Sequence, residues 1–117
     1  MVWSNHNMKR MSSILTSVFI FSMILFSVYA RNWRIGDGGL ARWDTNCDFN
    51  GSDIDHVPST GAQCGGVCIA DARCTHFTYS SGTCHKKRYL GSGFRERYAG
   101  GDAVCGWIVN RSGQPSK

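Results

Sequence analysis

The chain has 117 residues, a formal net charge of +5 and six cysteines. This length fits one domain rather than several, and the basicity is too mild to indicate a nucleic-acid partner. A domain of this size buries only a marginal core, so we expect the even set of cysteines to stabilise it as disulfides.

Residues 1–30 have the layout of a secretory signal peptide. The basic pair Lys9-Arg10 precedes an apolar run over residues 14–28, and Val28-Tyr29-Ala30 has the form of a cleavage site. The apolar run is shorter than the roughly 20 residues of a membrane-spanning helix, although a retained signal anchor is the alternative. We therefore expect a secreted, extracellular protein that begins at Arg31 and has no stable membrane span.

All six cysteines lie after the expected cleavage point, as Cys47, Cys64, Cys68, Cys74, Cys84 and Cys105. In an exported chain of this size, an even number predicts a framework of disulfides, although many pairings are possible. Disulfides consume the thiolates that a catalytic cysteine or a zinc site beside His76 or His85 would need. We therefore expect no enzyme activity, no metal and no other cofactor.

The first part of the expected mature chain is dense in residues that favour loops. Residues 31–40 are rich in glycine and predict a loosely held N-terminal arm. Residues 41–49 predict a first strand, with Trp43 as its largest apolar side chain. Residues 50–61 are dense in Asn, Gly, Ser, Asp and Pro, which predicts loop and turn.

A helix is predicted over residues 61–71. Thr60 and Gln63 have the spacing of a capping box, in which each side chain satisfies a free backbone N–H. Cys64 and Cys68 are one helical turn apart and share a face. Gly65 and Gly66 each cost about 1 kcal/mol relative to alanine. Covalent ties are therefore expected to hold this helix, and the glycines can let a neighbouring strand approach closely.

The second half predicts strands and ends in a polar tail. Residues 75–79 are β-branched and aromatic, residues 80–82 predict a turn, and residues 83–90 begin a return strand. After a basic, aromatic segment at residues 94–98, residues 103–109 predict the final strand, and the polar tail at residues 110–117 is expected to fray. The fold class is α+β, a small disulfide-rich domain with one short helix on an antiparallel sheet.

The segment from Cys64 to Cys84, CGGVCIADARCTHFTYSSGTC, closely resembles the core of PAN/Apple domains. The resemblance extends outward to Cys47 and Cys105 and places a PAN/Apple-like domain at residues 41–109. It implies the pairs Cys47–Cys105, Cys64–Cys84 and Cys68–Cys74. It also implies a non-enzymatic recognition module that binds a protein or a carbohydrate. Residues 85–104 are rich in Gly and Arg and depart from the family pattern, so their path does not follow from the resemblance.

A basic, aromatic stretch over residues 85–98 is the candidate ligand-binding surface. Its candidate residues are Lys86, Lys87, Arg88, Tyr89, Arg95 and Arg97. Clustered cations and aromatic faces suit an anionic polysaccharide, and the alternative is a solvated hairpin face whose aromatic side chains turn inward. Because the disulfides and apolar strands do not depend on these cations, alanines at Lys86, Lys87 and Arg88 are expected to leave the fold intact.

Two sequons and two rival functions complete the expectations. Asn50 and Asn110 each begin an N-glycosylation acceptor tripeptide. One rival is a cationic toxin or defence peptide acting on membranes, but the predicted helix is nearly uncharged, unlike a membrane-active one. The other rival is a secreted enzyme inhibitor, which the disulfide scaffold suits although no segment marks a reactive loop.

Overall fold

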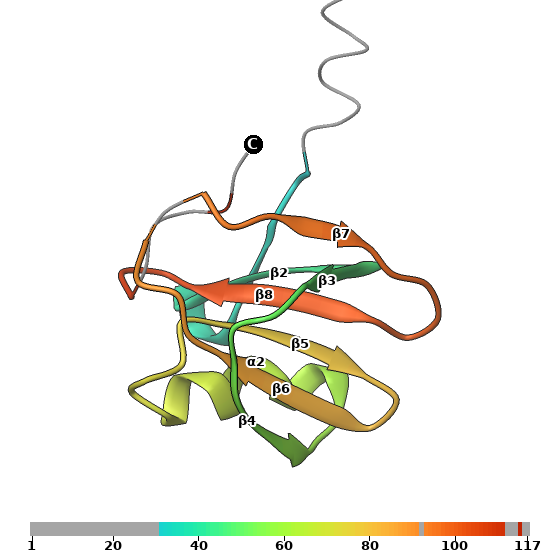
Figure 1. Ribbon diagram of the computed structural model, residues 1–117, viewed down its shortest axis with the longest axis horizontal. Coiled ribbons are helices and arrows are strands. Elements are labelled where there is room, and N and C mark those ends of the chain that lie inside the picture. The colour runs from blue at the N-terminus through green and yellow to red at the C-terminus, as the bar shows by residue number, and fades with distance from the viewer. Residues whose placement is uncertain (1–30, 92, 112–114, 116–117) are drawn as a thin grey trace, which may run out of the picture. The chain divides into compact units, whose positions relative to one another are not determined.

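The computed structural model describes residues 31–91, 93–111 and 115, and its elements all lie in the unit Asn32–Lys117 (Figure 1). The predicted signal peptide at residues 1–30 lies outside the described residues, as does most of the predicted tail. Among the described residues, no helix is both long enough and apolar enough to cross a membrane.

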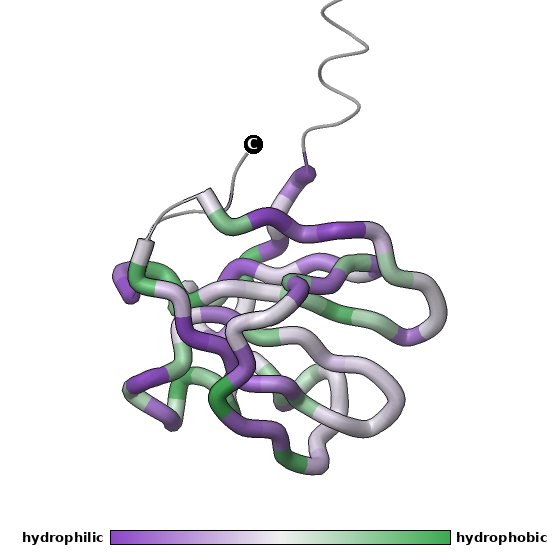
Figure 2. Tube along the Cα trace, in the orientation of Figure 1, coloured by the Kyte–Doolittle hydropathy of each residue, from purple (hydrophilic) through white to green (hydrophobic). Residues whose placement is uncertain are grey.

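The described unit contains two antiparallel sheets and one α-helix, which confirms the predicted α+β class. The six-stranded sheet has the order β1-β2-β8-β5-β6-β4. Its strands are β1 (Arg34–Gly36), β2 (Ala41–Thr45), β4 (Asp53–Pro58), β5 (His76–Ser80), β6 (Thr83–Lys87) and β8 (Val104–Ile108). The two-stranded sheet joins β3 (Cys47–Phe49) to β7 (Glu96–Tyr98), and Figure 2 shows β7 as a hydrophilic segment.

The helix α2 (Gly61–Ala70) begins and ends close to the predicted positions. Thr60 is its extended N-cap, and the Thr60 hydroxyl accepts a hydrogen bond of 3.2 Å from the backbone N–H of Gln63. The helix ends one residue before the predicted Asp71, which is an extended C-cap. Cys64, Gly65 and Cys68 are its buried residues, so the face that carries both cysteines packs against the domain.

The predicted loose arm at residues 31–40 is wrong, because these residues form β1 and a short 3-10 turn, η1 (Asp37–Gly39). Strand β1 pairs with β2 through Arg34↔Trp43 and Gly36↔Ala41. Gly38 and Gly39 have φ of 66° and 95°, which glycine adopts without steric cost. The glycines that suggested a loose arm therefore form the tight turn that returns the chain into the sheet.

The predicted loop at residues 50–61 is also wrong, because it contains the edge strand β4. Strand β4 pairs with β6, with Asp53 opposite Lys87 and Asp55 opposite Lys86. Cross-strand pairs of opposite charge favour this register. Pro58 stands at the end of the strand, where a missing N–H is tolerated on a sheet edge.

The predicted first strand at residues 41–49 is divided between the two sheets. Asn46 separates β2 from β3 and has a left-handed φ of 56°, a conformation that asparagine tolerates better than most residues. Its backbone N–H donates to the carbonyl of Ala103 at 2.8 Å. Strands β5, β6 and β8 occur where they were predicted, with ends that differ by up to three residues, whereas β7 lies in a segment for which no strand was predicted.

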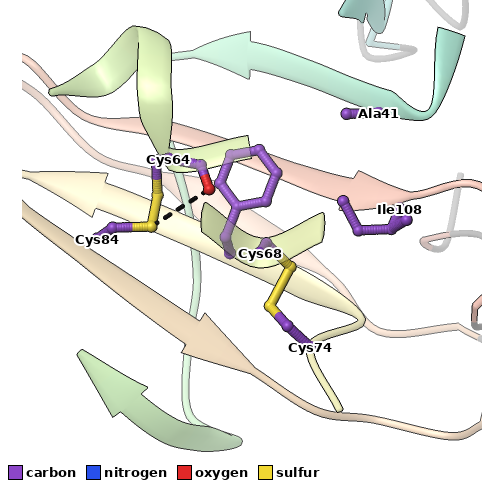
Figure 3. Close-up of a cluster of buried hydrophobic side chains, with 7 residues drawn as sticks. Ala41, Cys64, Cys68, Cys74, Cys84 and Ile108 are labelled. Carbon is purple, nitrogen blue, oxygen red and sulfur yellow. Dashed lines mark hydrogen bonds between the residues drawn. A yellow bond between two sulfur atoms is a disulfide. The ribbon is translucent and has the colours of Figure 1, made fainter. Parts of the chain in front are cut away.

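The six-stranded sheet has a core on each face. Figure 3 shows the core beneath α2, which comprises Ala41, Cys64, Cys68, Cys74, Phe77, Cys84 and Ile108. His76 and Trp107 are paired in register beside the pair Phe77 and Gly106, so their side chains point to the opposite face. There Trp107 joins the second core, with Cys47, Phe49 and Cys105, against which Trp33 and Phe94 pack.

Three buried disulfides fasten these layers, in the three pairs that the family resemblance implies. Cys64–Cys84 joins α2 to β6, and Cys68–Cys74 joins the end of α2 to the segment before β5. Cys47–Cys105 joins β3 to β8 on the opposite face of the sheet. Each face of the main sheet is therefore covalently tied to the layer that covers it.

The expectation of a frayed tail is wrong at Arg111, whose guanidinium is held at the end of α2. One of its terminal nitrogens donates to the carbonyls of Cys68, Asp71 and Cys74 at 3.1, 2.9 and 3.1 Å. The other donates to the carbonyl of Ile69 at 2.7 Å. These carbonyls belong to the last turn of the helix and the turn after it, where helical partners are missing.

Candidate functional site

The structure does not bring the predicted cations of residues 85–98 to one exposed surface. Lys86 is 9% exposed and Lys87 is 3% exposed. As neighbours on β6, their side chains point to opposite faces of the sheet. The predicted anionic-ligand site is therefore wrong at these lysines, because their charges are satisfied within the fold.

Each lysine has its own carboxylate partners. The Lys86 ammonium lies 3.0 Å from Asp71 and 3.3 Å from Asp55, and hydrogen bonding to Asp71 raises the pKa of Lys86. Hydrogen bonds from Arg73 and then Lys86 hold the pKa of Asp71 well below its usual range. The Lys87 ammonium pairs with Asp53 and donates to the carbonyl of Gly51 at 3.0 Å.

The remaining candidates in this stretch lie in different surroundings. Arg97 pairs with Asp48 at 2.9 Å. Arg88 and Arg95 are exposed and have no ion-pair partner among the described residues. Tyr89 is 42% exposed, and its ring meets Phe94 edge-on at 6.1 Å. Only two isolated arginines of the predicted polyanion surface therefore present unpaired charge.

The two sequon asparagines are accessible. Asn50 and Asn110 are both exposed. Ser112, which completes the second sequon, lies outside the described residues. Glycosylation at either position stays a prediction.

An apolar cavity lies on the face of the sheet that carries α2. We call it the Trp43–Phe77 pocket, and its volume is about 330 Å³. Its lining residues are Gly36, Asp37, Trp43, Gly61, Ala62, Gly65, Phe77 and Val104. The pocket therefore lies between the N-terminal arm and the first turns of α2, with side chains from the sheet between them.

Two glycines make room for the side chains that line this pocket. A Cβ atom on Gly65 would lie 2.3 Å from an Asp37 carboxylate oxygen and 3.5 Å from the Phe77 ring. A Cβ atom on Gly36 would lie 2.8 Å from Cδ1 of Trp43. The close neighbour of Gly65 is thus the Asp37 side chain of η1 and not the neighbouring strand that was expected. At Gly66 an added Cβ would reach only 3.8 Å from Asp37.

Trp43 and Asp37 give the pocket its chemical character. The Trp43 ring is partly buried, and the Arg34 guanidinium lies 5.0 Å from the ring centroid. Asp37 is exposed and has a left-handed φ of 52°. Its carboxylate has no hydrogen-bond or ion-pair partner among the described residues. An indole ring, a phenyl ring and an available carboxylate therefore border one cavity.

A second cavity, of about 280 Å³, lies on the other face of the sheet and is more polar. It is lined by Asp48, Asn50, Gly51, Asp53, Thr78, Ser80, His85, Lys87, Ala99, Gly100 and Ala103. Its principal polar groups are already engaged. Asp48 pairs with Arg97 and Asp53 with Lys87, while the Thr78 hydroxyl accepts from the backbone N–H of Phe49 at 3.0 Å. A ligand there would have to compete with these internal contacts.

His76 is a core residue. It is 2% exposed, its Nδ1 lies 2.9 Å from the Thr75 hydroxyl, and its ring stacks on Phe94 at 4.6 Å. Burial, followed by the charge of Lys87, lowers the pKa of His76 to about 4. His76 therefore packs as a neutral aromatic side chain at neutral pH.

Neither cavity contains a cluster of three or more potential metal ligands or a free thiol among the described residues. Among the described residues, no group of three or more His, Cys, Asp and Glu side chains is arranged to hold a metal ion. All six cysteines are in disulfides, so none is available as a nucleophile. Ligand recognition is the role that the Trp43–Phe77 pocket can support directly.

Sequence reasoning missed this pocket because its residues come from five separate segments. Trp43 stood out as a large side chain, but Asp37 belonged to a segment that was expected to be loose. The two adjacent glycines of the helix were the one local signal, since they cost helix stability without an evident local benefit.

Compared with family models, curated proteins and solved structures, the chain gives no significant match. The resemblance to PAN/Apple domains therefore stays a prediction from the cysteine spacing. The function has to be argued from the geometry of the chain itself.

Proposed function

We propose that the protein is a secreted, non-enzymatic recognition module of the PAN/Apple type that binds an uncharged sugar residue in the Trp43–Phe77 pocket. Three intramolecular disulfides are typical of extracellular proteins and support export. The observation that carries the proposal is the unpartnered Asp37 carboxylate beside the rings of Trp43 and Phe77.

The pocket has the chemistry of a small polar ligand with one apolar face. Its volume of about 330 Å³ is at the lower end of the range for small-molecule sites. Trp43 and Phe77 offer apolar surface to the C–H face of a pyranose ring. The Asp37 carboxylate can accept charge-assisted hydrogen bonds from sugar hydroxyl groups. One apolar wall and one strong acceptor together orient such a ring.

Charge favours an uncharged sugar over an anionic one. Asp37 is the only charged residue among those that line the pocket. A sulfate or carboxylate group would meet this like charge without a compensating cation in the lining. The proposed ligand therefore differs from the anionic polysaccharide that the sequence predicted.

The rival functions receive less support from the geometry. Helix α2, the one α-helix of the described residues, carries no charged residue and buries both of its cysteines. Membrane-active helices instead combine a basic face with an exposed apolar face. For an enzyme inhibitor, no described loop stands out as a reactive segment. A partner protein that inserts an apolar side chain into the same pocket is the outcome to be distinguished from glycan binding.

A glycan array probed with the disulfide-bonded protein and matched pocket variants tests this proposal. Asp37→Asn keeps the shape of the side chain but removes its charge. We expect this variant to bind the sugar about tenfold to a hundredfold more weakly, because that is the contribution of a hydrogen bond to a charged group. Gly65→Ala should abolish binding because its methyl group would displace the Asp37 carboxylate from its position beside the pocket. Gly66→Ala, at the next residue of the same helix, should bind like the wild type.

Circular dichroism and thermal melts establish that each variant is folded. Binding confined to sulfated or carboxylated glycans would contradict the proposal. So would an array signal that neither Asp37→Asn nor Gly65→Ala alters. If no glycan binds and an extracellular protein is captured in a manner that depends on Gly65, the pocket is a protein-docking site and the sugar assignment is wrong.

A further inference from the structure

Two histidines face each other across neighbouring strands at the edge of the main sheet. His56 of β4 and His85 of β6 are direct partners in the antiparallel register. Their ring centroids are 6.0 Å apart and their planes are inclined by 38°. His56 is exposed and His85 is half-buried. The pair is independent of the Trp43–Phe77 pocket, which lies on the other face of the sheet.

This spacing suits chelation of one metal ion by both rings. Zinc binds imidazole nitrogen at about 2.0–2.1 Å, which brings the centroids of two chelating rings about 5–6 Å apart. A small rotation of the exposed His56 side chain would therefore allow both rings to reach the same ion. Among the described residues, the ring nitrogens of His56 and His85 have no hydrogen-bond partner that would oppose this rotation.

The charges around the pair permit a cation to bind. Lys87, two residues after His85 on β6, points to the same face, but its ammonium is paired with Asp53 and is almost completely buried. Lys86 and Asp55 lie on the opposite face, where they pair with each other. The nearest lysine charge on the histidine face is therefore already compensated.

We propose that His56 and His85 form a two-histidine site for a divalent transition-metal ion such as Cu²⁺ or Ni²⁺. Hard cations such as Ca²⁺ and Mg²⁺ should not bind there. Imidazole nitrogen suits copper, nickel and zinc, whereas calcium and magnesium require oxygen ligands. Two protein ligands leave the other coordination positions to water or to a bound molecule. His85 also lines the polar cavity, so these open positions lie at its rim.

The sequence alone could not indicate this site, because the two histidines are far apart in the sequence. His56 also lies in β4, where a loop had been predicted. The fold brings them together, so an ion that binds both rings must bind the folded state in preference to the unfolded state. Metal binding should therefore raise the melting temperature.

Titration of the untagged, disulfide-bonded protein with Cu²⁺ and Ni²⁺ at neutral pH tests the site by calorimetry and by thermal melts. The melting temperature should rise with metal and return to its starting value with EDTA. His56→Gln and His85→Gln should each lower the affinity about a hundredfold, because each replaces chelation by a single contact. The double variant keeps neither imidazole and should show no measurable binding of either metal.

Asp55→Asn is the matched control, since Asp55 precedes His56 on the same strand but its carboxylate pairs with Lys86 on the opposite face. It should bind metal like the wild type. Binding that survives in the double variant, or that depends on only one of the two histidines, would overturn the proposal.

Discussion

Gly106 occupies a position in β8 where no side chain fits. A Cβ atom there would lie 2.3 Å from the Phe77 ring and 2.6 Å from the backbone carbonyl oxygen of Arg42. The ring could turn only against the core beneath α2, and the carbonyl belongs to the paired strand β2. The close packing of the sheet around Phe77 therefore depends on this glycine.

We predict that Gly106→Ala destabilises the protein by about 1–3 kcal/mol, the usual cost of overpacking a core. Urea denaturation under non-reducing conditions measures the effect. Gly66→Ala is the control, because its methyl group would make only ordinary contact, 3.8 Å from Asp37. It should stabilise the protein by up to about 1 kcal/mol through helix propensity. Equal losses in both variants would show that steric crowding at Gly106 is not the cause.

His76 should make stability depend on pH. Its pKa falls from 6.5 to about 4 on folding, chiefly through burial. Between these values the unfolded chain binds more protons than the folded protein, so stability is complete above the higher pKa and decreases as the pH falls toward the lower one. The full decrease is about 3 kcal/mol. Urea denaturation at several pH values from 7.5 to about 4 should reveal it.

His76→Phe provides the comparison for this pH dependence. Phenylalanine can keep the stacking on Phe94 and cannot be protonated. The variant should therefore lose most of the decrease between the two pKa values. Asp55 and Asp71, whose pKa values are lowered by their partners, lose ion-pair stabilisation only at lower pH, as the pH falls below their unfolded value of 3.8. A wild-type stability that stays constant from pH 7 to 5 would contradict the role assigned to His76.

At the scale of elements, the end of α2 depends on a residue from the far end of the chain. Helix C-termini leave carbonyl groups without helical partners. A glycine after the helix commonly lets the backbone N–H groups that follow donate to these carbonyls. Here Arg111 donates to the carbonyls of Cys68, Ile69, Asp71 and Cys74. The glycine-poor end of α2 is therefore closed by a tertiary contact.

Removing this contact should release the end of the helix. We predict that Arg111→Ala costs about 2–3 kcal/mol, because several hydrogen bonds from a charged group are lost together. Amide exchange should accelerate most in residues 68–74. The exposed Arg88 is the control, and Arg88→Ala should change stability by less than about 0.5 kcal/mol. Identical exchange rates for residues 68–74 in the wild type and in Arg111→Ala would mean that the Cys68–Cys74 disulfide alone holds the end of the helix.

The elements that sequence reasoning found are those with strong local signals. The cap at Thr60, the β-branched run before Tyr79 and the turn at Gly82 are local features, and each appears close to its predicted place. Strand β4 was missed because its polar residues resemble a loop until Lys86 and Lys87 pair with them across the sheet. The same pairs explain why the lysines looked solvated in the sequence, since their partners lie at least fifteen residues away.

At the scale of the whole molecule, the three disulfides close loops of different length. Cys47–Cys105 spans 58 residues, whereas Cys68–Cys74 spans 6. A longer loop restricts the unfolded chain more, by about 4 kcal/mol against about 2 kcal/mol on the chain-entropy model. Replacing both cysteines of the longer loop with alanine should therefore be the more damaging change. Chemical denaturation of the two double variants compares them, and an equal or reversed order would contradict this account.

The charged residues of β6 also contribute to the stability of the whole domain. The variant with Lys86→Ala, Lys87→Ala and Arg88→Ala was expected from the sequence to keep its fold, but two of these side chains are buried in ion pairs. We now predict that it melts well below the wild type, with Lys87→Ala alone costing about 1–3 kcal/mol. Arg88→Ala should melt like the wild type. A triple variant with an unchanged melting temperature would show that these ion pairs contribute nothing.

The Cys47–Cys105 bond determines how the protein would respond to a pulling force applied at its two ends. Tension would pass through the bond and bypass residues 48–104, so residues 31–117 would extend to roughly a third of the length that they reach in the reduced chain. The segment before Cys47 would still peel away, and it carries Gly36, Asp37 and Trp43. Force would thus open one wall of the Trp43–Phe77 pocket while α2 stays in place, and a bound ligand would be released before the domain unfolds.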